Sequence, residues 1–251
     1  MDKYLTDTKF WQKRVKNYDK LQWVKTEDYL KAFVTMCQAK KQDNVLDLGT
    51  GTGMIAYALC DKVKKVIGVD YSKEMLKEAK KHNHKENINF VYTDIRSIPL
   101  HNNSFEIITA RMVFHHLLWG LNKAMDEVKR VLKEKGLFCL SEGVPPCKCV
   151  DSFYKAVFLL KEKRRTFYAE DLEKLFIKWG FKNIKVREYI IKHCSIKNWL
   201  DNSGNLTNEI KNQIYNMHIN LHQEGKNAYN MRITENDCFI DMKFIIISGK
   251  K

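Results

Sequence analysis

Three glycines at alternate positions mark the first stretch of this sequence that could bind a ligand. Gly49, Gly51 and Gly53 stand in the segment VLDLGTGTG, residues 45–53, within and after a short apolar run. A glycine-rich turn between a strand and a helix lets the backbone approach a ligand closely, and the helix N-terminus offers free N–H groups. The spacing is not that of a dinucleotide site, because Met54 stands where G-x-G-x-x-G requires its third glycine. No Lys-Ser/Thr pair follows, so the turn is not a P-loop either.

Three aspartates belong to successive predicted strands or follow them directly. A carboxylate at Asp47 disfavours a pyrophosphate but suits an ammonium or a sulfonium. Asp70 is placed to accept hydrogen bonds from two ribose hydroxyls. Asp94 can accept from an exocyclic amine such as that of adenine, while Ile95 packs on the ring. Together with the glycine turn, the three acids predict a site for a nucleoside that carries positive charge and no phosphate. Taken alone, Asp70 and Asp94 would more readily be interpreted as capping a helix or forming a turn, and it is their combination with the glycine turn that favours ligand contact.

The elements that must position these residues alternate between short apolar strands and amphipathic helices. This alternation predicts an α/β fold with a parallel sheet covered by helices on both faces. Strands are expected over residues 44–49, 65–70, 88–92, 105–110 and 137–143, and helices over 8–38, 53–63, 72–83 and 121–136. Beyond Gly143 the pattern predicts a loop and helix over 144–167, a helix over 169–180, a strand over 181–193, mostly helix over 195–236 and a last strand over 238–250.

The composition bounds the class of protein. The chain has 251 residues, 44% of them hydrophobic, enough for one sizeable core. No apolar run is long enough to span a membrane, and the first residues lack the apolar core of a secretory signal. Seven cysteines, mostly scattered, indicate a reduced, cytoplasmic protein, and the pair Cys147 and Cys149 lacks further ligands at metal-binding spacing. The net charge of +14 comes from lysines spread over nearly every segment, which favours a solvated surface over a nucleic-acid site.

Four motifs in order carry a resemblance to a known family. They are VLDLGTGTG (45–53), VIGVDYSKEML (66–76), TDIRSIPLHNNSFEIITARMVFHHL (93–117) and EVKRVLKEKGLFCLSEG (127–143). Residues 40–143 therefore resemble class I S-adenosylmethionine-dependent methyltransferases, in particular the small-molecule branch that includes the ubiquinone/menaquinone C-methyltransferases. The resemblance implies a Rossmann-like sheet of seven mostly parallel strands with helices on both faces, an antiparallel last strand and a helical lid.

The resemblance also implies that ten residues bind S-adenosylmethionine. They are Asp47, Gly49, Thr50, Gly51, Gly53, Asp70, Tyr71, Asp94, Ile95 and Arg111. In the family, the glycines form the turn beneath the methionine part, and Asp47 and Thr50 lie beside its amino-acid end. Tyr71 stacks near the adenine. Asp70 binds the ribose, and Asp94 and Ile95 hold the adenine. Arg111 faces the methionine carboxylate in such proteins, with a purely structural role as the open alternative.

Two neighbouring histidines are the candidates for a general base. Methyl transfer mainly needs alignment and exclusion of water, and a base is needed only when the acceptor must lose a proton. His115 and His116 follow the fourth strand at the carboxyl ends of the sheet, where open α/β sheets bind ligands. The alternative is that one histidine caps the following helix and the other packs against the lid. Of the two, we expect His115 to be the nearer neighbour of the acceptor.

The remaining segments are expected to choose the acceptor. We predict one domain, residues 1–251, with N-terminal helices over 1–40, a cofactor core over 41–143, lid segments over 144–168 and 192–236, and a last strand over 237–251. Aromatic residues are frequent in the helices and lid, which suits an aromatic or apolar small molecule. Arg164, Arg165 and Arg232 could meet an anionic group on it.

Other functions remain open at this point. An RNA (tRNA) methyltransferase is permitted by the charge, but the chain has no Asn/Asp-Pro-Pro-Tyr/Phe tetrapeptide and no appended RNA-binding module. A nicotinamide-dependent dehydrogenase is disfavoured by Met54, and a non-catalytic S-adenosylmethionine-binding protein by the intact acids. We expect a small-molecule substrate, no nucleic-acid partner, no metal, and a monomer or homodimer.

Overall fold

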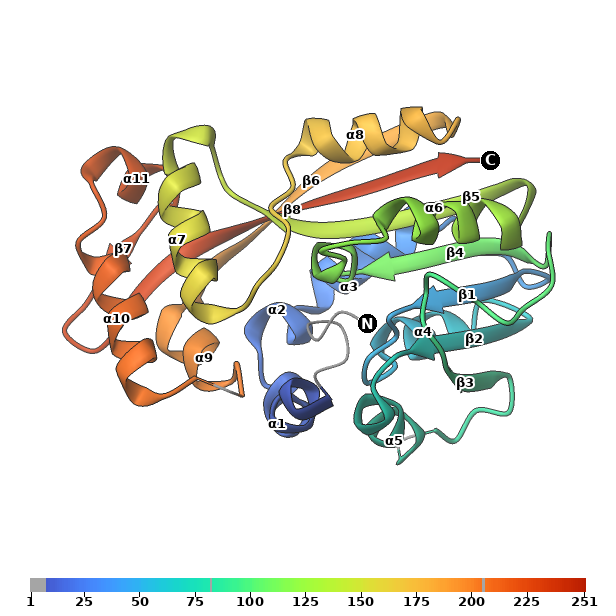
Figure 1. The fold of residues 1–251 in the computed structure, drawn as a ribbon, viewed down its shortest axis with the longest axis horizontal. Helices are drawn as coiled ribbons and strands as arrows, with labels where there is room; N and C mark the ends of the chain where they lie inside the picture. Colours follow the sequence, from blue (N-terminus) through green and yellow to red (C-terminus); the bar gives the residue numbers. More distant parts are fainter. Residues whose placement is uncertain (1–7, 82, 205) are drawn as a thin grey trace.

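Seven long strands and one short strand form a single sheet in the computed structural model, which describes residues 8–81, 83–204 and 206–251 (Figure 1). The strands are β1 Asn44–Leu48, β2 Lys65–Asp70, β3 Ile88–Tyr92, β4 Phe105–Arg111, β5 Leu132–Val144, β6 Lys182–Ser195, β7 Arg232–Ile233 and β8 Cys238–Lys250. Their order is β3-β2-β1-β4-β5-β8-β6, with β7 paired to β8. The pairs among β1 to β5 are parallel, and β8 is antiparallel to both β5 and β6. The predicted mostly parallel sheet with an antiparallel last strand is confirmed, and two-residue β7 is an addition.

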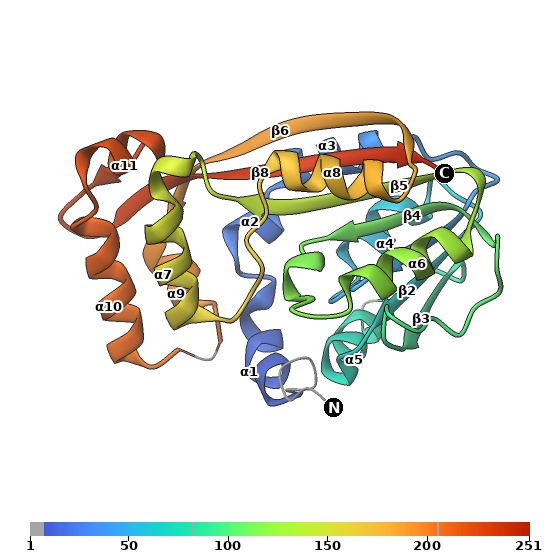
Figure 2. The ribbon, with the colours of Figure 1, turned by 45° about the horizontal axis from the view of Figure 1, so that its top comes forward.

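Helices cover both faces of this sheet. The α-helices are α1 Thr8–Tyr18, α2 Gln22–Lys25, α3 Glu27–Met36, α4 Met54–Cys60, α5 Lys73–Lys81, α6 Leu121–Val131, α7 Asp151–Lys161, α8 Ala169–Lys178, α9 Ile196–Asp201, α10 Asn208–Ile219 and α11 Gln223–Ala228; the 3-10 turns are η1 Phe114–His116 and η2 Lys148–Val150. One buried cluster joins the sheet to α3, α4 and α5, and another joins it to α6 and α8 (Figure 2). Adjacent residues of a strand point to opposite faces, so Val45 enters the first cluster and Leu46 the second. None of the described helices combines the length and apolarity needed to cross a membrane.

The outer helices, α7, α9, α10 and α11, gather at one end of the molecule. Strands β6 and β8 run out toward them, away from β1 to β3 (Figure 1). These helices lie in the two chain segments, 144–168 and 192–236, that were predicted to form the lid. Helix α1 lies between the outer helices and α5 (Figures 1 and 2) and contacts α5 directly. The N-terminal helix therefore stands between the two halves of the molecule.

The predicted helix over residues 121–136 is wrong at its C-terminal end. Helix α6 stops at Val131, and β5 begins at Leu132, which pairs with Phe105 of β4. Lys135 takes the left-handed conformation, and Gly136 lies inside the strand instead of ending a helix. The helical spacing of apolar residues continues past Val131. Leu132 nevertheless joins the sheet, because it pairs with β4 and is fully buried there.

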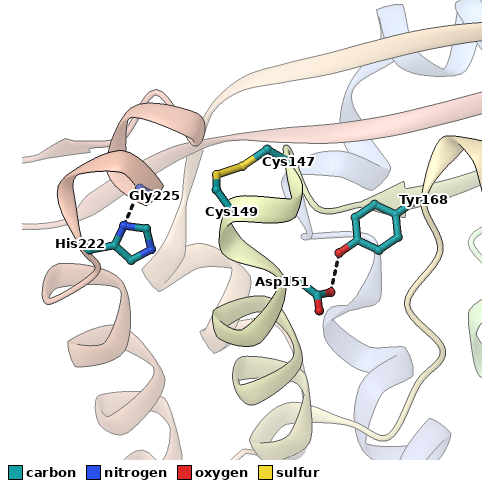
Figure 3. Close-up of a disulfide and its surroundings, with 6 residues drawn as sticks. All are labelled: Cys147, Cys149, Asp151, Tyr168, His222 and Gly225. Atoms are coloured by element: carbon teal, nitrogen blue, oxygen red, sulfur yellow. Dashed lines mark hydrogen bonds between the residues drawn. A yellow bond between two sulfur atoms is a disulfide. The ribbon is translucent and has the colours of Figure 1, made fainter.

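The loop between β5 and α7 contains a disulfide (Figure 3). Cys147 and Cys149 are bridged, with their Cα atoms 5.3 Å apart, within the range that a disulfide spans. The expectation that the cysteines are reduced is therefore wrong for this pair, while the other five cysteines are free and buried. In the described part of the chain, no cluster of three or more His, Cys, Asp and Glu side chains could hold a metal ion.

Candidate active site

The glycine turn joins β1 to α4 at the carboxyl edge of the sheet. All three glycines have positive φ, +60° at Gly49, +56° at Gly51 and +87° at Gly53, a region that other residues rarely adopt. A Cβ on Gly49 would lie 2.5 Å from a methyl of Val113. Gly49 and Gly51 line a cavity of about 720 Å³, whereas Gly53 lines no described cavity and is the N-cap of α4. The turn therefore places two of its glycines at a ligand site and uses the third to start the helix.

Asp47 and Arg111 line a small chamber of about 280 Å³ beside this turn, together with Thr50. Asp47 Oδ1 accepts a hydrogen bond from Thr109 at 2.8 Å, but Oδ2 is buried without a partner among the described residues. Arg111 Nη1 and Thr50 Oγ1 are likewise buried and unpartnered there. Burial raises the pKa of Asp47 to about 6, against hydrogen bonds and the charge of Arg111, which lower it. A carboxylate and a guanidinium with free capacity match the ammonium and carboxylate of an α-amino acid.

Asp70 lies at the end of β2 and holds the glycine turn in place. Its Oδ2 accepts from the backbone N–H of Gly51 at 2.9 Å, and its Oδ1 accepts from Ser72 N–H at 2.8 Å. Burial raises its pKa to about 6, and those backbone bonds oppose the shift. Asp70 lines the 720 Å³ cavity beside Tyr71, whose ring stacks on Tyr92 with centroids 5.4 Å apart. The acid and the aromatic ring are thus placed together, as predicted for a nucleoside site.

Asp94 also lines that cavity, next to Ile95, but it already has a strong partner. Its Oδ1 accepts from the backbone N–H of Arg96 at 2.8 Å and from Arg96 Nε at 2.9 Å. Burial would raise the pKa of Asp94, but the Arg96 guanidinium and N–H outweigh it and the pKa is lowered. The guanidinium in turn lies 3.6 Å from the ring centroid of Trp119. Asp94 therefore both forms a turn, which was the alternative left open, and lines the cavity.

A second cavity, of about 820 Å³, adjoins the first. The two share Trp11, Tyr18, Met112 and His116 in their linings. The second is walled mainly by aromatic and apolar side chains, which include Trp23, Phe153, Tyr154, Val157, Phe158, Trp199, Tyr229, Ile240 and Phe244. The N-terminal and outer helices supply most of these side chains, and β8 supplies Ile240 and Phe244. We call the first cavity the cofactor cavity and the second the acceptor cavity.

Two of the three arginines predicted to meet an anion do not reach the acceptor cavity. Arg165 donates to the carbonyls of Leu117 and Leu118, which fixes the chain after η1. Arg232 is exposed on β7 and faces the ring of Phe239. Only Arg164 lines the cavity. Arg165 points away from the cavity that its neighbour Arg164 lines, and Arg232 lies on the exposed two-residue strand β7.

The two histidines differ in surroundings. His115 is buried, and its Nδ1 lies 2.6 Å from Glu142 Oε2. Glu142 Oε1 also accepts from the N–H groups of Val113 and His115. Burial lowers the pKa of both histidines well below the usual value, and burial raises the pKa of Glu142 to about 7. Both histidines line the acceptor cavity, but only His116 also lines the cofactor cavity, so His116 is the one at the junction.

A buried charged cluster in the acceptor cavity was not predicted from the sequence. Arg14 of α1 forms an ion pair with Glu162, and Lys161 Nζ lies 3.2 Å from the other Glu162 oxygen. Each of these three side chains is at most 6% exposed. In the sequence they belong to runs such as LLKEKRR, which normally indicate a solvated surface. A charged run that follows an aromatic amphipathic helix was the only available signal.

Comparison with known proteins places this geometry in a family. A family profile described as "Methyltransferase domain" matches residues 46–140. The chain is 36% identical over 116 residues to the uncharacterized methyltransferase YcgJ of Bacillus subtilis (strain 168), covering 45% of this chain and 46% of that protein. It is 31% identical over 179 residues to the demethylmenaquinone methyltransferase of Staphylococcus haemolyticus (strain JCSC1435), covering 60% of this chain and 73% of that protein. The chain spans about half the length of the first of these relatives.

The fold comparison covers more of the chain. The crystal structure of the Bacillus subtilis YcgJ protein superposes with a TM-score of 0.81 at 26% identity, over 90% of this chain and 98% of that one. The profile, the curated relatives and this structure all indicate the same family. The chain belongs to the class I S-adenosylmethionine-dependent methyltransferases, whose cofactor is S-adenosylmethionine.

Proposed function

We propose that this protein transfers a methyl group from S-adenosylmethionine to a small-molecule acceptor that has an aromatic or apolar body and an anionic group. The observation that carries the proposal is the pair of adjoining cavities, one lined by cofactor-type polar groups and the other walled by aromatic rings. A transfer in line from one to the other would cross their junction at Trp11, Tyr18, Met112 and His116. The similarity to a demethylmenaquinone methyltransferase also favours a small molecule.

The unpartnered polar atoms fit the cofactor. Asp47 would hold the ammonium and Arg111 the carboxylate of its methionine part, since both have free, buried capacity of the required charge. Asp70 would accept from the ribose hydroxyls, and Tyr71 and Ile95 would contact the adenine. When bound, S-adenosylmethionine supplies a methyl group that its sulfonium has already activated. Met54, which stands where the dinucleotide pattern G-x-G-x-x-G needs its third glycine, argues against a nicotinamide cofactor.

The residues at the junction align the reactants and exclude water. Trp11 and Tyr18 cover both cavities from α1, and Met112 from the end of β4. If the acceptor must lose a proton, His116 is placed to take it, because it is uncharged near neutral pH and lies at the junction. His115 would act as a positioning residue, fixed by Glu142 against the neighbouring ring at a centroid distance of 3.9 Å.

Transfer of labelled methyl groups tests the proposal. The protein is incubated with methyl-tritiated S-adenosylmethionine and either a small-molecule metabolite extract or total tRNA. The proposal predicts that label enters the small-molecule fraction and not the tRNA, and that at a subsaturating cofactor concentration this labelling is reduced in the Asp47→Asn variant. Label in tRNA alone would assign the protein to RNA methylation, and no label in either fraction would favour a non-catalytic cofactor-binding protein.

A further inference from the structure

We infer that Arg14, Lys161 and Arg164 form an anion-binding subsite at the cofactor end of the acceptor cavity, and that the acceptor is an aromatic carboxylate or a similar planar oxyanion. The inference rests on the proposed function and names its substrate class. It replaces the sequence-based expectation, which placed this role on the Arg164, Arg165 and Arg232 side chains.

The subsite joins elements from both halves of the molecule. Arg14 comes from α1, Lys161 ends α7, and Arg164 follows in the connection to α8. Glu162 accepts from Arg14 and from Lys161 and so holds the two cations together. Arg164 donates through Nη2 to the carbonyl of Gly143 at 3.2 Å, which brings it back to the end of β5. The three cations therefore converge from separate elements on one cavity.

The cluster has more positive than negative charge to neutralise. Four cations line the cavity, Arg14, Lys161, Arg164 and Lys243, and Glu162 is the only carboxylate among its described lining residues. Because Lys243 is paired with Glu188 at 2.6 Å, three cations remain around Glu162. Arg14 is 5% exposed, and its Nε is buried with no hydrogen-bond partner in the described chain. Burial lowers the pKa of Lys161 to about 7 against the attraction of Glu162, and the charges of Arg14 and Arg164 lower it further. An incoming anion would satisfy the free donor and the excess charge together.

The surroundings set the shape and the position of that anion. The Arg14 guanidinium lies 5.6 Å from the ring of Trp11 and 5.8 Å from that of Tyr18, two residues shared with the cofactor cavity. On the other side, Lys161 Nζ lies 5.1 Å from the ring of Trp199, and the Arg164 guanidinium 4.5 Å from that of Phe158. A flat apolar body between these rings with an oxyanion toward Arg14 fits both the walls and the charge.

Matched pairs of acids and amides test the subsite. Benzoate, cinnamate and 2-naphthoate are titrated by calorimetry into the S-adenosylhomocysteine-loaded protein, each against its uncharged primary amide of the same shape. The inference predicts that the acids bind at least tenfold more tightly than the amides. Lys161→Met and Arg164→Gln should reduce acid binding and leave amide binding unchanged, whereas Glu162→Gln should tighten acid binding by removing the internal counter-charge. Lys155→Met removes a 59%-exposed lysine of α7 and should change neither.

Several results would overturn the inference. Equal binding of acids and amides would do so, as would an acid preference that survives both Lys161→Met and Arg164→Gln, or a loaded protein that binds none of the six probes. Thermal unfolding and S-adenosylhomocysteine affinity show that each variant is folded. If S-adenosylhomocysteine itself fails to bind, the proposed function fails; the same probe series without it then decides the subsite separately.

Discussion

Asp47 and Arg111 are buried charged residues, and each has one polar atom without a hydrogen-bond partner among the described residues. In a folded protein such groups are costly unless a ligand completes them. Asp47 has one oxygen without a partner among the described residues, and burial raises its pKa to about 6. Its predicted role is therefore both geometric and electrostatic, and it can be tested through both.

Replacing Asp47 by asparagine should weaken S-adenosylhomocysteine binding roughly tenfold or more, about 1.5–3 kcal/mol for a charge-assisted hydrogen bond. Because the ammonium binds the carboxylate, Asp47 must lose its proton on binding, and wild-type affinity should fall as the pH drops through 6. Calorimetry between pH 5 and pH 7.5 should show a shallower pH dependence in the variant, with the remaining slope due to Asp70. An unchanged affinity and slope would contradict the assignment.

Substitutions of the two histidines should have different effects, one on the rate of methyl transfer and the other on stability. With an acceptor that loses a proton, His116→Asn should lower kcat by about 10²-fold or more, the usual effect of removing a general base. His115→Asn should mainly lower the free energy of unfolding, because it leaves the buried Glu142 without its imidazole partner. Steady-state rates and urea unfolding are measured for both variants. Equal, mild rate losses would mean that neither histidine is the base.

At the level of elements, the sequence predicted strands β1 to β4 nearly to the residue. Their β-branched and apolar runs are bounded by glycine, aspartate or turn residues, so local pattern was sufficient. The boundary between α6 and β5 was missed because Leu132 is decided by its pairing with Phe105, a contact that no local pattern contains. The same holds for the disulfide between Cys147 and Cys149 and for the position of α1 over the junction of the two cavities.

The ion pair between Arg14 and Glu162 ties α1 to the end of α7 across 148 residues of sequence. Glu162→Leu should lower the free energy of unfolding by about 3–5 kcal/mol, since it leaves buried cations uncompensated. The double variant Arg14→Met/Glu162→Leu should recover much of that loss, because it also removes the buried arginine, which cannot lose its proton, whereas Lys161 can. Urea unfolding of the three proteins gives both values. A double variant as unstable as the single one would contradict the uncompensated-charge explanation.

For the molecule as a whole, the sequence predicts the residues of the cofactor cavity better than those of the acceptor cavity. The family profile covers residues 46–140, which hold all ten predicted cofactor residues. The acceptor cavity is built largely from outside that segment, by α1, α7 and the helices between β6 and β8. Its charged cluster joins residues that the sequence separates by most of its length. Sequence therefore indicates the cofactor, while the proposed class of acceptor rests on the assembled cavity.

We propose that the glycine turn and its acids bind a sulfonium nucleoside and not a dinucleotide. Calorimetric titration with S-adenosylhomocysteine and with NADH tests it most directly, in the wild type, in Asp70→Ala and in the surface control Asp61→Ala. We predict that S-adenosylhomocysteine binds and NADH does not. Asp70→Ala should weaken binding by about 1.5–3 kcal/mol and Asp61→Ala should not. Binding of NADH alone, or equal affinity in the two variants, would contradict the account.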